Sequence, residues 1–249
     1  MLLRDRTAVI SGAASARGIG RAAARLFTEH GARVAILDID GAAAEAAARE
    51  LGGGALGLAC DVTDKAACEA AVARALGAFG RIDALLNNAG ITEPVKIMEV
   101  GAAGWRRVID VNLTGTLNLS QAVIPHMRAR RSGSIICMSS VSALRGGGIF
   151  GGPHYSAAKA GVLGLAKAMA RELGPDNIRV NAIAPSLIDT DITAGGLTPE
   201  RRARVLEDVP LGRVGTAREV AGVYLFLASD LSSYITGAVI DVNGGSLIH

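Results

Sequence analysis

Short apolar runs rich in branched residues alternate with helix-forming segments along almost the whole chain, and this alternation restricts the possible folds more than any other feature. The intervening segments, such as 41–51 and 65–76, are rich in Ala, Leu, Glu and Arg and are long enough to connect successive strands. The apolar runs predict seven strands, at 7–10, 33–37, 55–59, 83–86, 134–138, 179–183 and 239–242. The pattern therefore predicts an α/β protein with a parallel, doubly wound sheet and helices on both faces.

The chain shows no change of composition that would mark a linker, so we expect one domain over residues 1–249. It is 50% hydrophobic but only 3% aromatic, which suits an α/β core of aliphatic side chains more than an aromatic-rich sandwich. A chain of 249 residues is also long enough to bury such a core.

The charge pattern argues against a nucleic-acid partner. The net charge is +3, and the basic runs 128–131 and 201–204 have no interleaved aromatic residues, so they are interpreted as solvated helix ends or faces. No apolar run reaches the roughly 18 residues of a membrane span. We therefore expect a cytoplasmic protein that binds neither nucleic acid nor membrane.

The three cysteines, Cys60, Cys68 and Cys137, have neither the density of a disulfide framework nor the spacing of metal ligands. They are interpreted as buried or inert thiols. The sequence predicts no metal site.

The stretch SGAASARGIG, residues 11–20, lies between the first predicted strand and the first predicted helix. Gly12, Gly18 and Gly20 would let backbone N–H groups approach a pyrophosphate at the positive end of that helix. A tight strand-to-helix turn is the alternative. Asp38 ends the second strand about twenty residues later, where a carboxylate can accept hydrogen bonds from ribose hydroxyls.

Tyr155 and Lys159, in YSAAKAG, are four residues apart and share one face of a helix. An ammonium beside a phenol makes the phenol easier to ionise, so the pair suggests a tuned acid/base. Ser139 and Ser140, in CMSSVSA, follow a strand and could face the same cleft.

Seven motifs occur in order: SGAASARGIG, CDV, NNAG, DVNLTG, SSVSA, YSAAK and APSLIDT. Together they resemble the short-chain dehydrogenase/reductase family over essentially the whole chain. The resemblance implies a Rossmann-like fold, a nicotinamide cofactor, a small-molecule substrate and hydride transfer between a secondary alcohol and a ketone. It also implies a homo-oligomer, either a tetramer or a dimer.

The resemblance also implies roles for individual residues. Tyr155 would be the general acid/base, and Lys159 would lower its pKa and hold the nicotinamide ribose. Ser140 would orient the substrate oxygen, and Asn112 would hold a water in the proton relay. The implied cofactor-binding residues are Gly12, Arg17, Gly18, Ile19, Gly20, Asp38, Asp61, Val62, Asn88, Ala89, Gly90, Tyr155, Lys159, Pro185, Ile188 and Thr190.

The chain departs from the commonest family pattern at three places. Ala16 and Arg17 lengthen the nucleotide loop by two residues, and the glycine-rich interval from Ser140 to Tyr155 is also two residues longer. Ser186 stands where a Pro-Gly pair is usual. None of these departures removes a catalytic group.

Arg17 and Asp38 favour opposite cofactors. An arginine before the second glycine resembles the family's contact to the 2′-phosphate of NADP. The Asp38 carboxylate would repel that phosphate by roughly 4 kcal/mol at about 4 Å and an effective dielectric near 20, which exceeds what one exposed arginine recovers. We therefore predict NAD over NADP, with Arg17 near the pyrophosphate or paired with an acidic neighbour.

The substrate is the least determined feature. Segments 145–154 and 191–210 flank the predicted site, and Gly195, Gly196 and a helix start near Thr198 suggest that the second is a lid; a surface loop is the alternative. The predicted substrate contacts are Ser140, Arg145, His154 and Tyr155, and the polar pair Arg145 and His154 favours a sugar, polyol or hydroxy acid.

Two alternative functions remain open at this stage. One is an NADPH-dependent 3-oxoacyl-thioester (ketoacyl) reductase, which uses the same catalytic groups. The other is a non-catalytic nucleotide-sensing protein, which would be expected to lack a catalytic residue.

Overall fold

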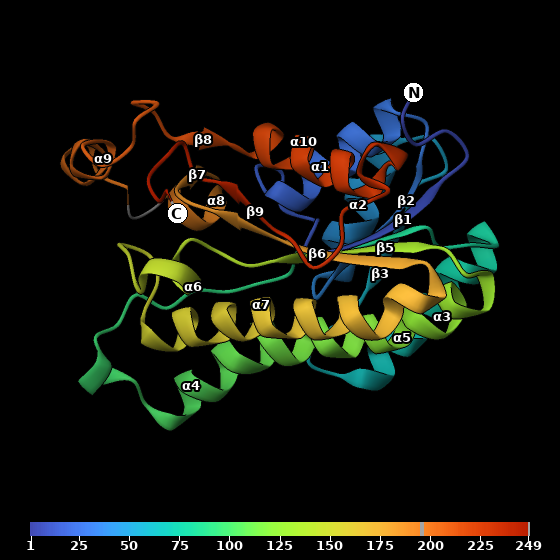
Figure 1. The fold of residues 1–249 in the computed structure, drawn as a ribbon, viewed down its shortest axis with the longest axis horizontal. Helices are drawn as coiled ribbons and strands as arrows, with labels where there is room; N and C mark the ends of the chain where they lie inside the picture. The colour runs from blue at the N-terminus through green and yellow to red at the C-terminus, as the bar shows by residue number, and fades with distance from the viewer. Residues whose placement is uncertain (195–196, 249) are drawn as a thin grey trace.

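A parallel sheet of seven strands runs through the centre of the computed structural model, which describes residues 1–194 and 197–248 (Figure 1). The strand order is β3-β2-β1-β4-β5-β6-β9. The strands are β1 (Thr7–Ser11), β2 (Arg33–Asp38), β3 (Leu56–Ala59), β4 (Ala84–Asn87), β5 (Gly133–Met138), β6 (Ile178–Pro185) and β9 (Val239–Val242). All seven predicted strands are present, and the predicted doubly wound fold is confirmed.

The strands are buried on both faces because helices cover each side, which explains their continuous apolar runs. β1 is buried along its whole length, with Val9 opposite Ala35 of β2 and Leu85 of β4. The chain order reverses between β1 and β4, and in open sheets of this kind ligands bind beyond the carboxyl ends of the strands at that point. The topology thus places a binding site after β1 and β4.

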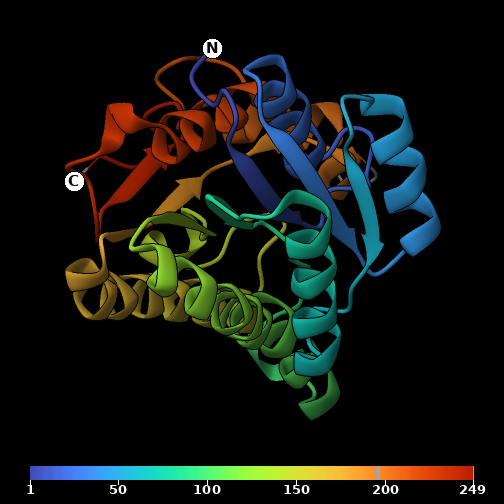
Figure 2. The same ribbon diagram turned by 90° about the vertical axis from the view of Figure 1, so that its right-hand side faces the viewer.

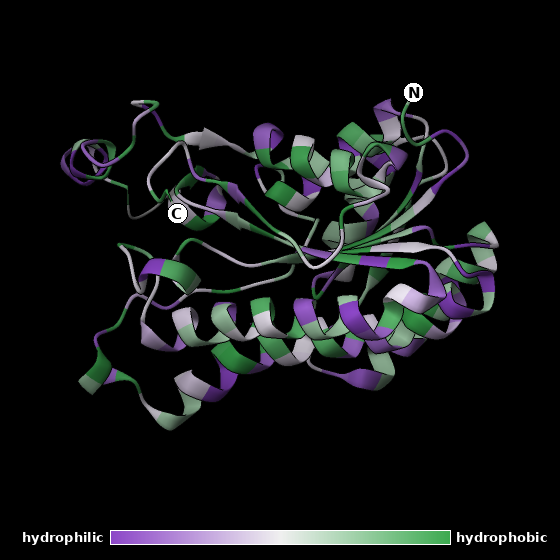
Figure 3. Ribbon diagram, viewed as in Figure 1, coloured by the Kyte–Doolittle hydropathy of each residue, from purple (hydrophilic) through white to green (hydrophobic). Residues whose placement is uncertain are grey.

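Two layers of helices cover the sheet, as the view along the strands shows (Figure 2). On one face lie α1 (Ile19–Glu29), α2 (Gly41–Leu51) and α10 (Ala217–Ala228), whose core includes Phe27 and Tyr224. On the other lie α3 (Lys65–Phe79), α5 (Gly115–Arg130) and α7 (Pro153–Leu173), whose core includes Leu119 and Val162. The apolar residues concentrate on the strands and on the inner faces of these helices (Figure 3).

Several shorter elements gather near the carboxyl ends of the strands (Figure 1). They are α4 (Ala102–Ile109), a π-helical turn (Asp110–Thr114), α6 (Ser142–Arg145), β7 (Ile188–Asp189), α8 (Asp191–Ala194), α9 (Pro199–Leu206) and β8 (Gly215–Thr216). β7 and β8 pair as a separate two-stranded sheet. The predicted lid 191–210 contains α8 and α9, whereas Gly195, Gly196 and the terminal His249 lie outside the described residues.

No helix in the described part of the chain combines the length and the apolar character needed to cross a membrane. Within residues 1–194 and 197–248, no group of three or more His, Cys, Asp or Glu side chains could hold a metal ion.

Candidate active site

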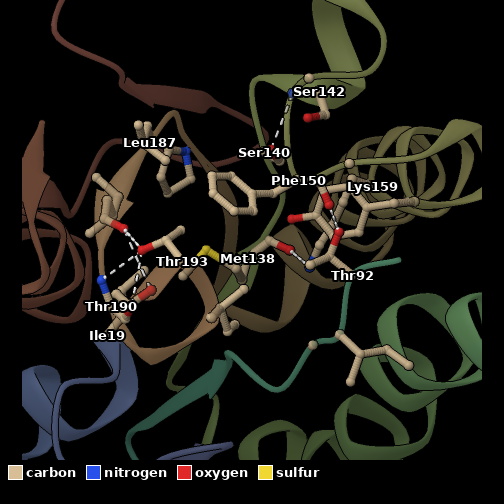
Figure 4. Close-up of a pocket in the computed structure, with 18 of the residues that line it drawn as sticks. Ile19, Thr92, Met138, Ser140, Ser142, Phe150, Lys159, Leu187, Thr190 and Thr193 are labelled. Atoms are coloured by element: carbon tan, nitrogen blue, oxygen red, sulfur yellow. Dashed lines mark hydrogen bonds between the residues drawn. The ribbon is translucent and has the colours of Figure 1, made fainter. Parts of the chain in front are cut away.

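A cavity of about 940 Å³ opens beyond the carboxyl ends of β1, β2, β4, β5 and β6. Figure 4 shows Ile19, Leu187, Thr190 and Thr193 on one side of it and Ser140, Thr92 and Lys159 on the other. The predicted site residues in its lining are Gly12, Gly18, Ile19, Asp38, Asp61, Val62, Asn88, Ala89, Gly90, Asn112, Ser140, Arg145, Tyr155, Lys159, Pro185, Ile188 and Thr190. Segments far apart in the sequence therefore meet in one cavity.

The glycine loop after β1 leaves room and donors for an anionic ligand. Gly12 has a φ of +62°, and a Cβ there would lie 2.7 Å from the Cα of Ala89, so a side chain is excluded. α2 and α3 are capped by the side chains of Asp40 and Asp64, whereas the N-cap residue of α1 is Gly18, which has no side chain, and the first turn of α1 contains no acidic residue. The first N–H groups of α1 remain available for phosphate oxygens.

Gly20 packs closely against Asn88 and the nucleotide loop. It does not line the cavity, and a Cβ at this position would lie 2.7 Å from both Asn88 Nδ2 and the carbonyl oxygen of Gly12. Asn88 Nδ2 itself donates to the carbonyl oxygens of Ser11, at 3.0 Å, and Gly12, at 2.9 Å. Gly20 thus permits the close packing by which Asn88 fixes the nucleotide loop.

Two carboxylates line the cavity beyond β2 and β3. Asp38 accepts a hydrogen bond from the backbone N–H of Ala14 at 3.0 Å, which ties the end of β2 to the nucleotide loop. Asp61 accepts from the backbone N–H and the hydroxyl of Thr63, at 2.9 and 2.8 Å. Each carboxylate retains acceptor capacity toward the cavity, as contacts to ribose hydroxyls or an adenine amino group require.

Tyr155 and Lys159 lie on the cavity side of α7, with the Lys159 ammonium nitrogen 5.6 Å from the centre of the Tyr155 ring. The helix is held to the end of β5 by two contacts: the Ser139 hydroxyl donates to the Lys159 carbonyl oxygen, and Lys159 Nζ donates to the Met138 carbonyl oxygen, both at 2.9 Å. Burial lowers the pKa of Lys159 to about 8. The ammonium is therefore fixed in place and easily deprotonated.

Ser140 faces the same space. Burial raises the pKa of the Tyr155 phenol, and a hydrogen bond between Tyr155 and Ser140 opposes this rise. The Ser140 hydroxyl oxygen already accepts from the backbone N–H of Ser142 at 3.1 Å, so its hydrogen is available for a carbonyl oxygen in the cavity. Serine and tyrosine together can bind one substrate oxygen.

Asn112 occupies the π-helical turn between α4 and α5 and is fully buried. Its Nδ2 donates to the carbonyl oxygens of Ile91 and Val108, both at 2.9 Å, while its Oδ1 has no hydrogen-bond partner among the described residues. A Cβ on Gly90 would lie 2.7 Å from that Oδ1 and 3.3 Å from Lys159 Nζ. The orphaned acceptor and the ammonium thus border one small space beside Gly90, which suits a proton-relaying water.

Arg17 is paired with acidic neighbours and does not line the cavity. Its guanidinium contacts Asp189, and its Nε lies 3.9 Å from Asp191. The Ser15 hydroxyl also donates to Asp191. Of the two alternatives given for Arg17, the structure therefore contains the acidic pairing.

The structure places His154, a predicted substrate contact, away from the cavity lining. Its side chain is fully buried, lies outside the cavity lining, and has Nε2 3.3 Å from the Glu93 carboxylate. Because His154 directly precedes Tyr155 on α7, it points about 100° away from the catalytic face. Arg145, in contrast, does line the cavity.

Ser186, which stands where a Pro-Gly pair is usual, directly follows the end of β6. Its N–H donates to the carbonyl oxygen of Val242 and its hydroxyl to that of Asn243, both at 3.2 Å. The missing Pro-Gly pair is thus replaced by bonds to the end of β9 and the residue after it.

A family model described as enoyl-(acyl carrier protein) reductase matches residues 12–246 of the chain. The chain belongs to the short-chain dehydrogenase/reductase family. It is 64% identical over 253 residues to an uncharacterized short-chain type dehydrogenase/reductase of Sinorhizobium fredii, with all of both chains covered. It is 45% identical over 248 residues to the 3-oxoacyl-[acyl-carrier-protein] reductase of Chlamydia muridarum, with 98% of each chain covered.

A solved structure of a related reductase supports the same family membership. The crystal structure of 3-oxoacyl-[acyl-carrier protein] reductase from Brucella melitensis matches with a TM-score of 0.89 and 42% identity, covering 98% of this chain and 93% of that one. This short-chain dehydrogenase/reductase is an oxidoreductase that acts on CH–OH or keto groups with a nicotinamide cofactor.

Sequence reasoning about this family member missed several residues at the site. Thr193 accepts from the backbone N–H of Thr190 at 3.1 Å and donates to its carbonyl oxygen at 2.9 Å, fixing the segment after β6. The Thr92 hydroxyl donates to the carbonyl oxygen of Phe150, which holds the glycine-rich interval against the loop after β4. The Thr92 contact has no local sequence signal, because it joins segments that only the fold brings together, whereas Thr190 and Thr193 are three residues apart in one segment.

Proposed function

We propose that the enzyme interconverts a 3-oxoacyl thioester and the 3-hydroxyacyl thioester, using NAD(H). The observation that carries this proposal is the distribution of polarity in the cavity. Ser140, Tyr155 and Lys159 stand together where the carbonyl oxygen would lie. The wall around and beyond them is mostly apolar and includes Ile149, Phe150, Leu187, Ile192, Val205 and Val209, with the charged Arg145, Arg201, Arg204 and Asp208 beside them.

An acyl thioester fits such a wall better than a sugar or polyol does. A hydroxylated substrate needs a hydrogen-bonding partner for each buried hydroxyl, and the apolar part of the wall, from Ile149 and Phe150 to Leu187, offers none from its side chains. One of the two polar residues that favoured a polyol, His154, is buried against Glu93 instead. The Chlamydia and Brucella relatives, both 3-oxoacyl-[acyl-carrier-protein] reductases, support the same choice.

Each polar side chain of the site would have a separate role in carbonyl reduction. When bound, the nicotinamide cofactor supplies the hydride to the keto carbon or accepts it in reverse. The Ser140 hydroxyl donates to the carbonyl oxygen and holds it beside Tyr155. The Tyr155 phenol donates its proton to that oxygen, and the Lys159 ammonium favours the phenolate that remains. Asn112 Oδ1 holds the water that returns a proton toward Lys159.

The cofactor would lie along the cavity, with its pyrophosphate at the N-terminus of α1 and its adenosine between Asp38 and Asp61. Val62, Asn88 and Ala89 would line the adenosine side, and Pro185, Ile188 and Thr190 would hold the carboxamide end. The preference for NAD over NADP rests on Asp38, whose carboxylate would accept from ribose hydroxyls and repel a 2′-phosphate.

We also assign the enzyme to the cytoplasm and to a homo-oligomer, either a tetramer or a dimer. The three cysteines are free, as is common in a reducing compartment. Trp105 of α4 and Leu117 of α5 are 45% and 37% exposed, which would suit a subunit contact. Gel filtration with light scattering measures the oligomeric state, and a monomer at working concentration would contradict the assignment.

Turnover of matched substrates tests the reaction. The purified enzyme is assayed by the absorbance of the reduced nicotinamide with acetoacetyl thioesters of coenzyme A and of N-acetylcysteamine, and in the reverse direction with polyols, sugars and hydroxy acids. We expect reduction of both thioesters to exceed oxidation of every polyol and sugar by at least about 10²-fold in kcat/KM. A polyol or sugar as the best substrate would overturn the acyl assignment. No turnover with any of them would favour a nucleotide sensor.

A further inference from the structure

The lengthened nucleotide loop is joined to the start of the predicted lid by a small polar cluster, here named the loop–lid bridge. It consists of Ser15 and Arg17 on the loop and Asp189 and Asp191 on the lid side. Arg17 forms ion pairs with both carboxylates, its backbone N–H donates to Asp191 at 3.4 Å, and the Ser15 hydroxyl donates to Asp191. Arg17 is one of the two residues by which the loop exceeds the commonest length, so the bridge depends on that insertion.

Ser15 and Asp191 of the bridge line the cofactor cavity. Ser15, Gly18 and Asp38 line the same cavity, and the backbone N–H of Ala14 donates to the Asp38 carboxylate at 3.0 Å. A group attached to a ribose hydroxyl that faces Asp38 would therefore lie next to loop 14–18. Arg17 follows Ala14 by three residues on this loop, so we take its long side chain, once released, to reach a phosphate there.

In this chain the guanidinium is engaged. The side chains of Arg17, Asp189 and Asp191 are 52%, 57% and 47% exposed, so solvent screens each pair, but two carboxylates act on one cation. A phosphate that recruited Arg17 would have to break these contacts and would leave two carboxylates unpaired nearby. The bridge thus keeps Arg17, the one cation of loop 12–18, from binding a 2′-phosphate.

We propose that Asp189 and Asp191 are specificity-determining residues, which exclude the phosphorylated cofactor by holding Arg17. They act together with Asp38, which repels the phosphate directly. This inference rests on the proposed preference for NAD. Its test, however, uses cofactor binding alone and needs no acyl substrate.

The decisive comparison uses two ways of breaking the same bridge. In the double variant Asp189→Asn/Asp191→Asn the guanidinium is released, whereas in Arg17→Gln it is removed. The triple variant Arg17→Gln/Asp189→Asn/Asp191→Asn combines both changes. Dissociation constants for NADPH and NADH are measured by fluorescence titration of the full-length enzyme, and the readout is the ratio of the two affinities.

We expect the double variant to shift the affinity ratio toward NADPH by at least about threefold, because a freed arginine gains a phosphate partner of modest strength. Arg17→Gln is expected to leave the ratio unchanged or to shift it toward NADH. The triple variant should lose the gain of the double variant. A bridge that only stabilised the loop would move both affinities in parallel and leave the ratio constant in all three variants.

Two results would overturn the inference: an unchanged ratio in the double variant, or a gain that survives in the triple variant, since that gain would come from removing negative charge alone. Glu29→Gln provides the control, because it breaks the ion pair with Arg218, 2.9 Å long and similarly exposed, away from the cavity. A wild-type enzyme that favours NADPH would contradict the proposed cofactor, but the change of ratio between variants would still decide the role of Asp189 and Asp191.

Discussion

The ammonium nitrogen of Lys159 lies 5.6 Å from the centre of the Tyr155 ring and is anchored 2.9 Å from the Met138 carbonyl oxygen. Met138 ends β5, so the sheet itself fixes the cation beside the phenol. We expect the ammonium to favour the phenolate by electrostatic attraction without accepting its proton directly. The arrangement assigns the two residues different roles, which substitutions can separate.

Replacing Tyr155 by Phe removes the titrating proton and keeps the ring. We expect kcat for carbonyl reduction to fall by at least about 10²-fold, while the dissociation constant for NADH changes little. Steady-state assays and cofactor titration measure the two effects. Lys159→Ala should instead impair both turnover and binding, since one ammonium would serve the phenol and the ribose. Turnover close to that of the wild type in Tyr155→Phe would refute the mechanism.

The buried Lys159 should also make the stability of the free enzyme depend on pH. Burial lowers its pKa in the folded state to about 8, below its ordinary value of 10.5, so between these pH values the unfolded chain binds more protons. Stability linked to this group is therefore lowest below about pH 8 and rises until about pH 10.5. Relative to Lys159→Met, the wild type should gain roughly 3 kcal/mol over this interval.

Denaturant unfolding at several pH values measures this difference. Lys167→Met serves as the control, because Lys167 lies on the same helix but is exposed. We expect its stability difference from the wild type to stay constant across the interval. A constant difference for Lys159→Met as well would show that the free enzyme holds this amine at its ordinary pKa.

Asp38 should determine much of the choice between NAD and NADP. We expect the wild type to favour NAD by more than about tenfold in kcat/KM, because the carboxylate repels a 2′-phosphate. Asp38→Ala removes this repulsion and should reduce the preference by at least about tenfold. Asp38→Asn keeps an acceptor for the Ala14 N–H, 3.0 Å away in the wild type, and so separates charge from loop positioning. A wild type that uses NADP more efficiently would contradict this prediction.

Arg145 and His154 should respond differently to substitution, although both belong to the segment before the catalytic helix. Arg145 lines the cavity, so Arg145→Ala should raise KM for the coenzyme A thioester by about threefold or more. His154 is fully buried against Glu93, so His154→Ala should lower the free energy of unfolding by about 1–3 kcal/mol and leave KM unchanged. Kinetics and denaturant unfolding distinguish these outcomes. A raised KM with unchanged stability in His154→Ala would show that His154 contacts the substrate.

The sequence was informative where the relevant spacing is local. Alternating apolar and helical segments predict the sheet, and the four-residue spacing of Tyr155 and Lys159 places both on one helix face. The same spacing rule would have excluded His154 from that face. The partners of Arg17 could not be predicted, because Asp189 and Asp191 are more than 170 residues away along the chain and approach the loop only after β6 joins the sheet. The π-helical turn that directs Asn112 has no sequence signal either.

Gly90 separates the two groups that would border the relay water. A Cβ at this position would lie 2.7 Å from Asn112 Oδ1 and 3.3 Å from Lys159 Nζ, and the backbone of Gly90 does not lie in the left-handed region. Asn112 cannot easily withdraw, because both N–H groups of its amide are held by the carbonyl oxygens of Ile91 and Val108. In Gly90→Ala the added methyl group therefore fills the space of the relay and displaces the ammonium.

We expect Gly90→Ala to lower kcat by at least about tenfold while the enzyme stays folded, as measured by steady-state kinetics and thermal unfolding. Gly164→Ala on α7 is the control, because its Cβ would meet nothing within 4 Å; it should retain full activity and gain up to about 1 kcal/mol of stability. Asn112→Ala removes the relay acceptor itself. If the methyl group acts by blocking this relay, Gly90→Ala/Asn112→Ala should be no slower than Asn112→Ala alone. Additive losses in the double variant would mean that Gly90 serves cofactor or backbone packing, and that the space beside it carries no proton.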